Sequence, residues 1–267
     1  MDSYTAEEIG CFRAVKSALL ADGVPARRIS DTMLVITTMC SKMRAEKAVT
    51  KFKECSIVMD DYALDPEGGG YDEICKRDWA DLEPFWSRYA SCGVDRGGSA
   101  VLWIRGGGKT LPEEERALVR TGFLAWAAVH SDLHTLRRGT TMVIDTTAAS
   151  AEKVGNERKL QKVWQSYPLR PQNIFIVGAG LIKRVAITAL IKFASLFTSN
   201  KVLSRIRFTA DMEPVKAAVA VEQMPTYVSE VEREEMSSWV RRRLSEFPQL
   251  PGGWDEGDDG GRAVGIA

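Results

Sequence analysis

Apolar residues recur at helical spacing through the first 62 residues of the chain. Thr5 and Glu8 have the spacing of a capping box, and Phe12, Val15 and Leu19 follow on one face of the helix that this box would open. The same spacing predicts a second helix from near residue 30 and a third from about residue 44 to residue 62. This part of the chain is therefore predicted to be all helical.

The pattern changes after residue 98, where short apolar runs alternate with longer segments of helical spacing. The short runs, which we interpret as strands, are residues 101–105, 141–145, 174–177 and 205–208. Strands of about five residues that alternate with helices of about 12 or more are typical of an α/β layer with a mostly parallel sheet. Ser229 and Glu232 then predict one more capped helix, and the Gly- and Asp-rich end of the chain is predicted to be disordered.

These patterns predict an α/β fold preceded by a small all-helical domain. The predicted parts are a helical domain (1–65), a linker with a short helix (66–97), an α/β domain (98–228), an amphipathic helix (229–247) and a disordered tail (248–267).

Charge and cysteine content restrict the binding partners and the cellular compartment that we expect. Lys plus Arg and Asp plus Glu both number 36, so no net charge draws the chain toward nucleic acid or an anionic membrane. The five cysteines are dispersed and form no Cys-x-x-Cys pair, which favours a reducing compartment over a disulfide framework or a zinc site. Residues 1–8 are acidic and polar, unlike a signal peptide, and no apolar run reaches the roughly 18 residues of a membrane span. We expect a cytoplasmic protein without a nucleic-acid partner.

One glycine-rich loop resembles a phosphate-binding loop. Residues 106–110 read Gly-Gly-Gly-Lys-Thr after a predicted strand, and Asp145 could supply a magnesium-binding acid. The earlier glycine of the motif is absent, because Trp103 stands at its position. The glutamates at 113–115 would also place negative charge where a phosphate binds. The pattern favours a plain strand-to-helix turn over a nucleotide site.

Two other patterns give weaker signals. Gly178 and Gly180 resemble a dinucleotide-binding turn, but Lys183 occupies the place of its third glycine and no acid follows about 20 residues later. His130 and His134 stand four apart on one predicted helix, a spacing that can hold a metal, yet no cysteine or third histidine accompanies them. We therefore expect no catalytic residue, no cofactor and no metal.

Four short motifs, in their order and spacing, resemble the CRAL-TRIO domain, the fold of lipid carriers such as the retinaldehyde-binding and alpha-tocopherol-transfer proteins. They are Val94-Asp95-Arg96-Gly97-Gly98, Ile144-Asp145, Tyr167-Pro168 and Glu222-Gln223-Met224-Pro225. The resemblance covers about residues 25 to 228. It departs from the family at Lys192-Phe193-Ala194-Ser195, at Val228 and at Gly178. The resemblance implies a CRAL-TRIO domain over residues 98–228.

A helix predicted from Leu181 to Phe197 is apolar nearly all round. Such a helix is either buried on every side, as in an ordinary core, or in contact with an apolar partner. In the CRAL-TRIO family this place holds the mobile gate helix that closes the lipid pocket. The resemblance therefore implies a gate whose outer face touches a membrane.

The resemblance also implies the residues of the site. Positions that match the lining of the lipid pocket are Trp126, Val129, Val143, Val163, Tyr167, Ile174, Ile176, Ile187, Leu190 and Ile191. Positions that match an anionic headgroup site, as for phosphoinositides, are Arg170, Lys201 and Arg205. Each apolar position could equally be plain core, and the basic ones a solvated face.

The expected function is non-enzymatic binding of a hydrophobic lipid and its transfer between membranes, with transient association at the membrane surface. The alternative is a protein-interaction or GTPase-regulating scaffold of the same fold with an unfilled pocket. An adenine-nucleotide or nicotinamide enzyme is a third hypothesis. The sequence leaves open whether the lipid is a phospholipid, sterol, retinoid or tocopherol, and it leaves the oligomeric state open as well.

Overall fold

The computed structural model describes residues 3–105, 115–147, 166–178 and 204–255. In chain order the helices are α1 (Ala6–Ala21), η1 (Ala26–Arg28), α2 (Asp31–Cys40), α3 (Ala45–Asp61), α4 (Tyr71–Cys75), η2 (Ala80–Arg88), α5 (Glu115–Val129), α6 (Leu133–Arg138), α10 (Glu213–Ala218), η3 (Val221–Gln223), α11 (Thr226–Ser229) and α12 (Met236–Ser245), where η marks 3-10 helices. The strands are β1 (Tyr89–Ala90), β2 (Val101–Arg105), β3 (Thr140–Asp145), β4 (Pro171–Val177) and β5 (Ile206–Thr209).

The first two helices begin where the sequence places them. The Thr5 hydroxyl accepts a hydrogen bond from the Glu8 amide, and the Glu8 carboxylate accepts one from the Thr5 amide, which completes a capping box. Ser30 caps α2 in the same way through the Met33 amide. Arg137 of α6 donates two hydrogen bonds to the Glu8 carboxylate and lowers its pKa, so the cap of α1 also ties α1 to α6.

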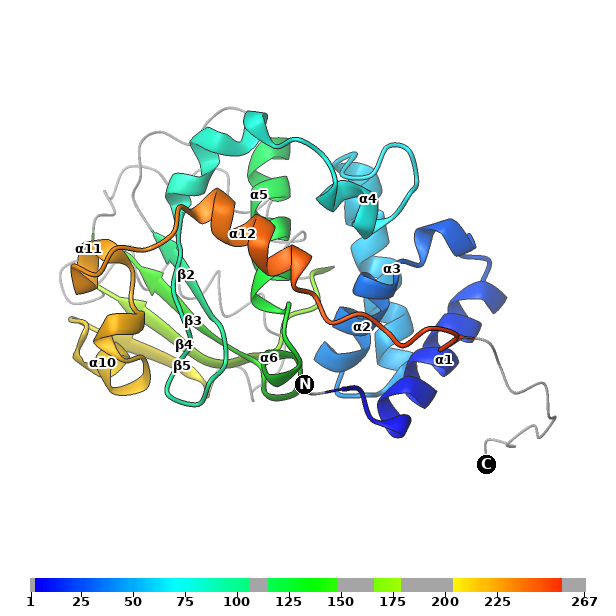
Figure 1. The fold of residues 1–267 in the computed structure, drawn as a ribbon, viewed down its shortest axis with the longest axis horizontal. Coiled ribbons are helices and arrows are strands. Elements are labelled where there is room, and N and C mark those ends of the chain that lie inside the picture. The colour runs from blue at the N-terminus through cyan, green and yellow to red at the C-terminus, as the bar shows by residue number, and fades with distance from the viewer. Residues whose placement is uncertain (1–2, 106–114, 148–165, 179–203, 256–267) are drawn as a thin grey trace.

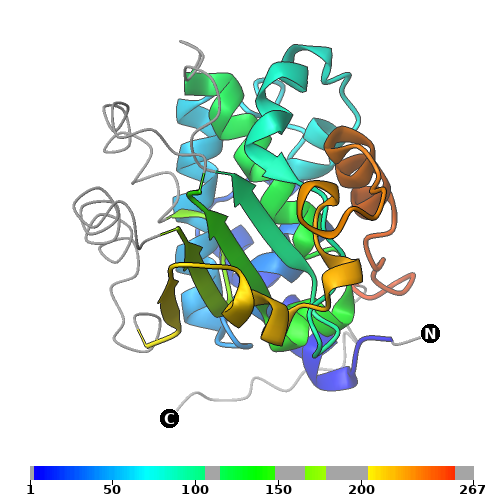
Figure 2. The same ribbon diagram turned by 90° about the vertical axis from the view of Figure 1, so that its left-hand side faces the viewer.

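The described strands form one five-stranded sheet in the order β1-β2-β3-β4-β5. Strands β2 to β5 run parallel, and the two-residue β1 pairs antiparallel with β2 at the edge. The α/β class and the mostly parallel sheet that the sequence predicts are thus confirmed. Seen as in Figure 2, the strands lie side by side in front of the blue amino-terminal helices.

The two faces of the sheet belong to different hydrophobic clusters, because successive side chains of a strand point to opposite faces. The α5 face packs against α5 and the amino-terminal helices, and its fully buried side chains are Leu102, Met142, Ile174 and Ile176. The α10 face packs against Val215 of α10, Val219 and Met224, and its side chains are Val101, Trp103, Val143, Phe175 and Val177. Helices α1 to α3 share one continuous core with the α5 face (Figure 1).

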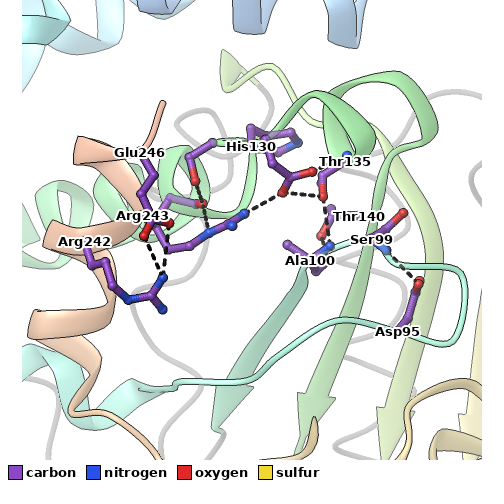
Figure 3. A network of polar contacts seen from close by, with 12 residues as sticks. Asp95, Ser99, Ala100, His130, Thr135, Thr140, Arg242, Arg243 and Glu246 are labelled. Atoms are coloured by element: carbon purple, nitrogen blue, oxygen red, sulfur yellow. Dashed lines mark hydrogen bonds and ion pairs between the residues drawn. The ribbon is translucent and has the colours of Figure 1, made fainter. Parts of the chain in front are cut away.

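A polar network fastens α12 to the rest of the molecule (Figure 3). Arg243 of α12 donates to the Asp132 carboxylate at 2.6 Å and to the Ala128 carbonyl at 3.1 Å. The Thr135 hydroxyl donates to Asp132 and accepts from the Ala100 amide, just before β2. Since Asp132 also caps α6, one carboxylate connects the carboxyl-terminal helix, the α5–α6 turn and the amino-terminal edge of the sheet.

The predicted start of the last helix is wrong. The Ser229 hydroxyl donates back to the carbonyls of Met224 and Pro225 and so ends α11, instead of opening a new helix. Glu230 follows with a left-handed φ of 59°, and α12 begins at Met236. The capping pattern at Ser229 and Glu232 was a false signal, because the same hydroxyl can terminate one helix or start another.

The segment at residues 248–255 is ordered, contrary to the predicted disorder of the tail. Trp254 is buried against the amino-terminal helices, where its indole N–H donates to Asp31 at 3.1 Å and its ring lies under the Lys16 ammonium at 4.9 Å. The Tyr4 hydroxyl donates to the Pro248 carbonyl at 2.8 Å. This segment therefore lies across the amino-terminal helices as a strap, which Figure 1 shows in red-orange beside α1.

Within the described residues, no helix is both long enough and apolar enough to cross a membrane.

Candidate functional site

Five of the ten predicted lipid-lining residues lie together. They are Trp126, Val129, Tyr167, Ile174 and Ile176, all buried in the cluster on the α5 face. They come from α5, from the segment before β4 and from β4 itself. All five thus belong to the large core on the α5 face, within which the rings of Trp126 and Tyr167 are in contact at 4.8 Å.

Val143 lies elsewhere. The structure places it on the α10 face with Trp103 and Phe175, so the sheet separates it from the other five residues. The sequence could not show which side chains of β3 point to which face of the sheet, because Met142, Val143 and Ile144 are all apolar and either orientation fits the pattern. Val143 therefore cannot line the same cavity as Ile174 and Ile176, and Met142 is the residue of β3 that shares their face.

The remaining predicted positions lie outside the described residues. They are Val163, Ile187, Leu190, Ile191 and Lys201, together with the whole predicted gate helix from Leu181 to Phe197.

Four aromatic rings form the centre of the site, and we call them the aromatic cluster: Tyr71, Phe123, Trp126 and Tyr167. Phe123 contacts both tyrosines, with ring centroids 5.3 Å from Tyr71 and 5.4 Å from Tyr167. Trp126 stands edge-on to Tyr167 at 4.8 Å. Tyr71 and Phe123 were not among the predicted site residues. The apolar spacing of α5 could have indicated Phe123, whereas Tyr71 follows three glycines and carries no pattern.

The polar atoms of this region are neutral. Burial raises the pKa of the Tyr71 and Tyr167 phenols well above the ordinary value, and it raises the pKa of the Cys40, Cys55 and Cys75 thiols to about 12. All five groups therefore stay protonated at pH 7. These side chains form an apolar or weakly polar region, and none of the five groups is an activated nucleophile.

Arg170 and Arg205 form a basic pair at the amino-terminal ends of β4 and β5. Arg170 donates to the carbonyls of Met39 and Leu136, and Arg205 donates to the Pro171 carbonyl. Partial burial, with the nearby Arg205 charge, lowers the pKa of Arg170. Two half-buried guanidinium groups held by backbone carbonyls retain N–H donors for an anion.

The carboxyl-terminal edge of the sheet holds a second polar group. The buried Asp145 carboxylate accepts from the Tyr227 hydroxyl at 2.6 Å and from the amide and hydroxyl of Thr147. The Trp103 indole donates to the same Tyr227 oxygen, and the Arg105 guanidinium lies over the Tyr227 ring at 4.5 Å. Asp145, the residue considered as a magnesium ligand, is thus engaged by side chains of the protein. The Gly106–Thr110 loop lies outside the described residues.

The two histidines do not share a helix, contrary to the sequence prediction. Helix α5 ends at Val129 and α6 begins at Leu133, so His130 lies in the turn between them and His134 in α6. His130 is fully buried, with Nδ1 2.7 Å from the Trp126 carbonyl oxygen, whereas His134 is exposed and contacts the Gly97 carbonyl. The described residues contain no group of three His, Cys, Asp or Glu side chains placed to hold a metal ion.

Because His130 is buried, we expect the protein to be less stable at acidic pH. Desolvation lowers its pKa to about 4, from about 6.5 in the unfolded chain, against the opposing effect of its hydrogen bond to Trp126. Between pH 4 and pH 6.5 the His130 side chain is protonated in the unfolded state but not in the folded state. The stabilisation of the folded state by neutral His130 is therefore complete above about pH 6.5 and decreases as the pH falls toward 4. We expect the free energy of unfolding to decrease by about 2 kcal/mol between pH 7 and pH 5 from this residue alone.

Urea unfolding at the two pH values measures this effect. His130→Gln should remove most of the pH dependence, and His134→Gln should keep it. Equal pH dependence in the wild type and His130→Gln would contradict the assignment.

Comparison with known proteins finds no matching family model and no matching curated protein.

Proposed function

We propose that this protein reversibly binds one small hydrophobic molecule, without covalent chemistry, and carries it between membranes. The observation that carries the proposal is the convergence of Trp126, Tyr167, Ile174 and Ile176 on the α5 face. These side chains are apolar or neutral, and removal of apolar surface from water contributes about 25 cal/mol per Å² to binding. A hydrophobic molecule held among them would be bound without any charged contact.

The resemblance to the CRAL-TRIO family supports the proposal independently of this geometry. The parallel run from β2 to β5, preceded by helices, is compatible with that fold. One of the motifs that carry the resemblance contributes to the site, since Tyr167, just before β4, lies in the cluster on the α5 face.

Membrane contact is the second part of the proposal. Arg170 and Arg205 would bind the phosphate of an anionic lipid headgroup, while the hydrophobic molecule enters or leaves. Contact of this kind is transient, because each basic residue near an anionic surface contributes only about 1 kcal/mol to the free energy of membrane binding. Salt screens this attraction.

Transfer between vesicles tests the proposal. Donor vesicles carry labelled phosphatidylcholine, cholesterol, retinol and tocopherol, and acceptor vesicles contain anionic lipid. We expect the protein to accelerate the transfer of one of these molecules, and we expect Arg205→Gln to slow it about fivefold at low salt. Lys53→Gln, the same charge change at an exposed residue of α3 paired with Asp22, should have no effect.

The salt dependence of the transfer rate provides a second test in the same assay. Wild-type transfer should fall toward the rate of Arg205→Gln as the salt concentration rises. If no lipid moves faster than in the absence of protein, the transfer proposal fails and the scaffold alternative is favoured. If transfer is fast but insensitive to Arg205→Gln and to salt, the basic pair has no headgroup role.

A further inference from the structure

Four arginines line the amino-terminal edge of the sheet, one before each of its parallel strands. Arg96 lies in the turn before β2, Arg138 ends α6 before β3, Arg170 directly precedes β4 and Arg205 directly precedes β5. Parallel strands all begin at the same edge of a sheet, so these four residues form a row across it. We call this row the basic rim.

Arg96 and Arg138 meet at the turn before β2. The Arg138 guanidinium donates to the Gly97 carbonyl at 3.3 Å, and Arg96 directly precedes this glycine; both arginines are exposed. Asp95 belongs to the same turn, but its carboxylate accepts hydrogen bonds from two backbone amides of the turn and from the Thr141 hydroxyl. Asp95 thus stabilises the turn and forms no ion pair with either arginine.

Arg170 and Arg205 continue the rim along the edge of the sheet. The end of α6 approaches the start of β4 so closely that a Cβ atom at Gly139, whose φ is 101°, would lie 2.4 Å from the Arg170 carbonyl oxygen. This glycine therefore allows Arg138 to lie next to Arg170. Arg205 donates to the carbonyl of Pro171, the residue after Arg170. The rim is continuous from β2 to β5.

In the part of the chain that the structure describes, none of the four arginines forms an ion pair with a carboxylate. Their side chains donate instead to backbone carbonyls, as Arg96 does to the Lys216 carbonyl at 3.4 Å. Arg137, the neighbour of Arg138 on α6, differs because it pairs with Glu8 at 2.8 Å. A guanidinium has five N–H donors, so one or two hydrogen bonds to carbonyls leave its charge uncompensated and further donors available to an anion.

The spacing of the rim fits an extended acidic chain better than a single anion. Neighbouring strands of a sheet lie about 4.8 Å apart, so residues that precede four consecutive strands span about 14 Å. One phosphate or carboxylate group can contact one or two arginines, whereas an extended peptide rises about 3.4 Å per residue and covers this span with about five residues. Clusters of arginines are a recurring means of binding acidic peptide segments.

The rim lacks the aromatic side chains that single-stranded nucleic acid uses, since its bases stack on exposed rings. The exposed aromatic side chains of the described residues are Phe208 and Tyr227. Phe208 pairs in register with Ile176 near the carboxyl-terminal end of β4, and Tyr227 bonds to Asp145 at the carboxyl-terminal end of β3. Neither ring lies at the amino-terminal edge, so a protein segment is the better fit.

We propose that the basic rim binds an extended acidic segment of a partner protein, whose Glu or Asp side chains pair with Arg96 and Arg138 as well as with Arg170 and Arg205. The last two arginines are those that would contact an anionic headgroup, so the acidic segment and the membrane compete for them. In this respect the inference rests on the proposed function, because a bound partner slows transfer. Binding of the segment itself does not depend on transfer.

Fluorescence anisotropy of fluorescein-labelled hexaglutamate with the full-length protein tests the inference. We expect saturable binding at low salt that weakens as the salt concentration rises, and no binding of labelled hexaglutamine. Arg96→Gln/Arg138→Gln should weaken hexaglutamate binding by about fivefold, because two exposed ion pairs are lost. Arg96→Lys/Arg138→Lys, which keeps both charges, should retain most of the affinity.

Arg116→Gln/Arg241→Gln is the matched control, because it removes the same charge from two exposed arginines outside the rim. Arg116 donates to the Ala63 carbonyl, and Arg241 pairs with Asp78. This variant should bind hexaglutamate as the wild type does. Thermal unfolding followed by circular dichroism verifies that each variant is folded. Equal weakening in the rim and control variants would overturn the inference, because it would reflect net charge alone.

The acidic residues Glu256, Asp258 and Asp259 of this chain, which lie outside the described residues, are the other candidate occupant of the rim. If the wild type fails to bind hexaglutamate but Glu256→Gln/Asp258→Asn/Asp259→Asn binds it, the rim belongs to the chain's own carboxyl-terminal segment. That result would overturn the proposal of a partner protein.

Vesicle transfer separates this inference from the proposed function. Hexaglutamate, but not hexaglutamine, should slow transfer by the wild type to anionic vesicles. Transfer without any hexaglutamate binding overturns the inference and leaves the proposed function standing. Hexaglutamate binding without transfer rejects the proposed function and leaves the binding of an acidic segment standing.

Discussion

Replacement of Phe175 by alanine is expected to lower the free energy of unfolding by about 3–5 kcal/mol and to leave ligand affinity unchanged. Phe175 is fully buried on the α10 face, beside Trp103 and Val143, and the Arg207 guanidinium lies 5.7 Å from its ring. A cavity there would weaken the packing of α10 on the sheet. It would not alter the α5 face, where the site lies.

The neighbouring residue provides the matched comparison. Ile174 is equally buried on the same strand, but it faces α5. Ile174→Ala should lower stability by about 2–5 kcal/mol and should also weaken binding of the transferred molecule by about tenfold, because contact area with that molecule is lost. Urea unfolding measures the stability, and titration of the protein with the molecule identified by the vesicle assay measures the affinity. If Phe175→Ala weakens binding as much as Ile174→Ala, the α5 face is not the binding face.

The second large effect concerns the strap at residues 248–255. Trp254→Ala should lower the free energy of unfolding by about 3 kcal/mol, although it lies near the end of the described chain. The substitution removes the hydrogen bond to Asp31, the contact with the Lys16 ammonium and the burial of a large ring, which is 6% exposed. The hydrogen bond from Arg13 to the backbone carbonyl of residue 254 would remain.

Urea unfolding followed by circular dichroism gives the magnitude. Gln249→Ala is the control, because the Gln249 amide bonds only to the Phe247 carbonyl within its own segment. That variant should stay within about 0.5 kcal/mol of the wild type. A change in Trp254→Ala as small as in the control would mean that the strap adds nothing to the fold.

Local patterns predicted much of the fold, because they involve residues near one another in sequence. The capping oxygens of Thr5 and Ser30 are three residues from the amides they accept from, so the starts of α1 and α2 follow from short-range chemistry. The apolar runs that became β2, β3, β4 and β5 alternate with helical spacing, which restricts the sheet to a mostly parallel one. These predictions are confirmed.

The features that sequence could not provide depend on distant contacts. The order of residues 248–255 depends on the contacts of Trp254 with Lys16 of α1 and Asp31 of α2, whereas local composition alone indicated disorder. The direction in which each side chain of β3 points depends on the register with β2 and β4, which is why Val143 and Ile174 were predicted to share one lining although they lie on opposite faces of the sheet. Tyr71 joins the aromatic cluster as the first residue of α4, directly after Gly70, whose positive φ of 81° favours glycine.

Native mass spectrometry of the purified protein tests the central claim most directly. The account predicts the 29.5 kDa chain together with one non-covalent hydrophobic molecule, which dissociates on denaturation. Protein stripped of this molecule should take up one equivalent again from vesicles. A bare chain mass both after purification and after incubation with vesicles would contradict the claim that this protein binds a hydrophobic molecule.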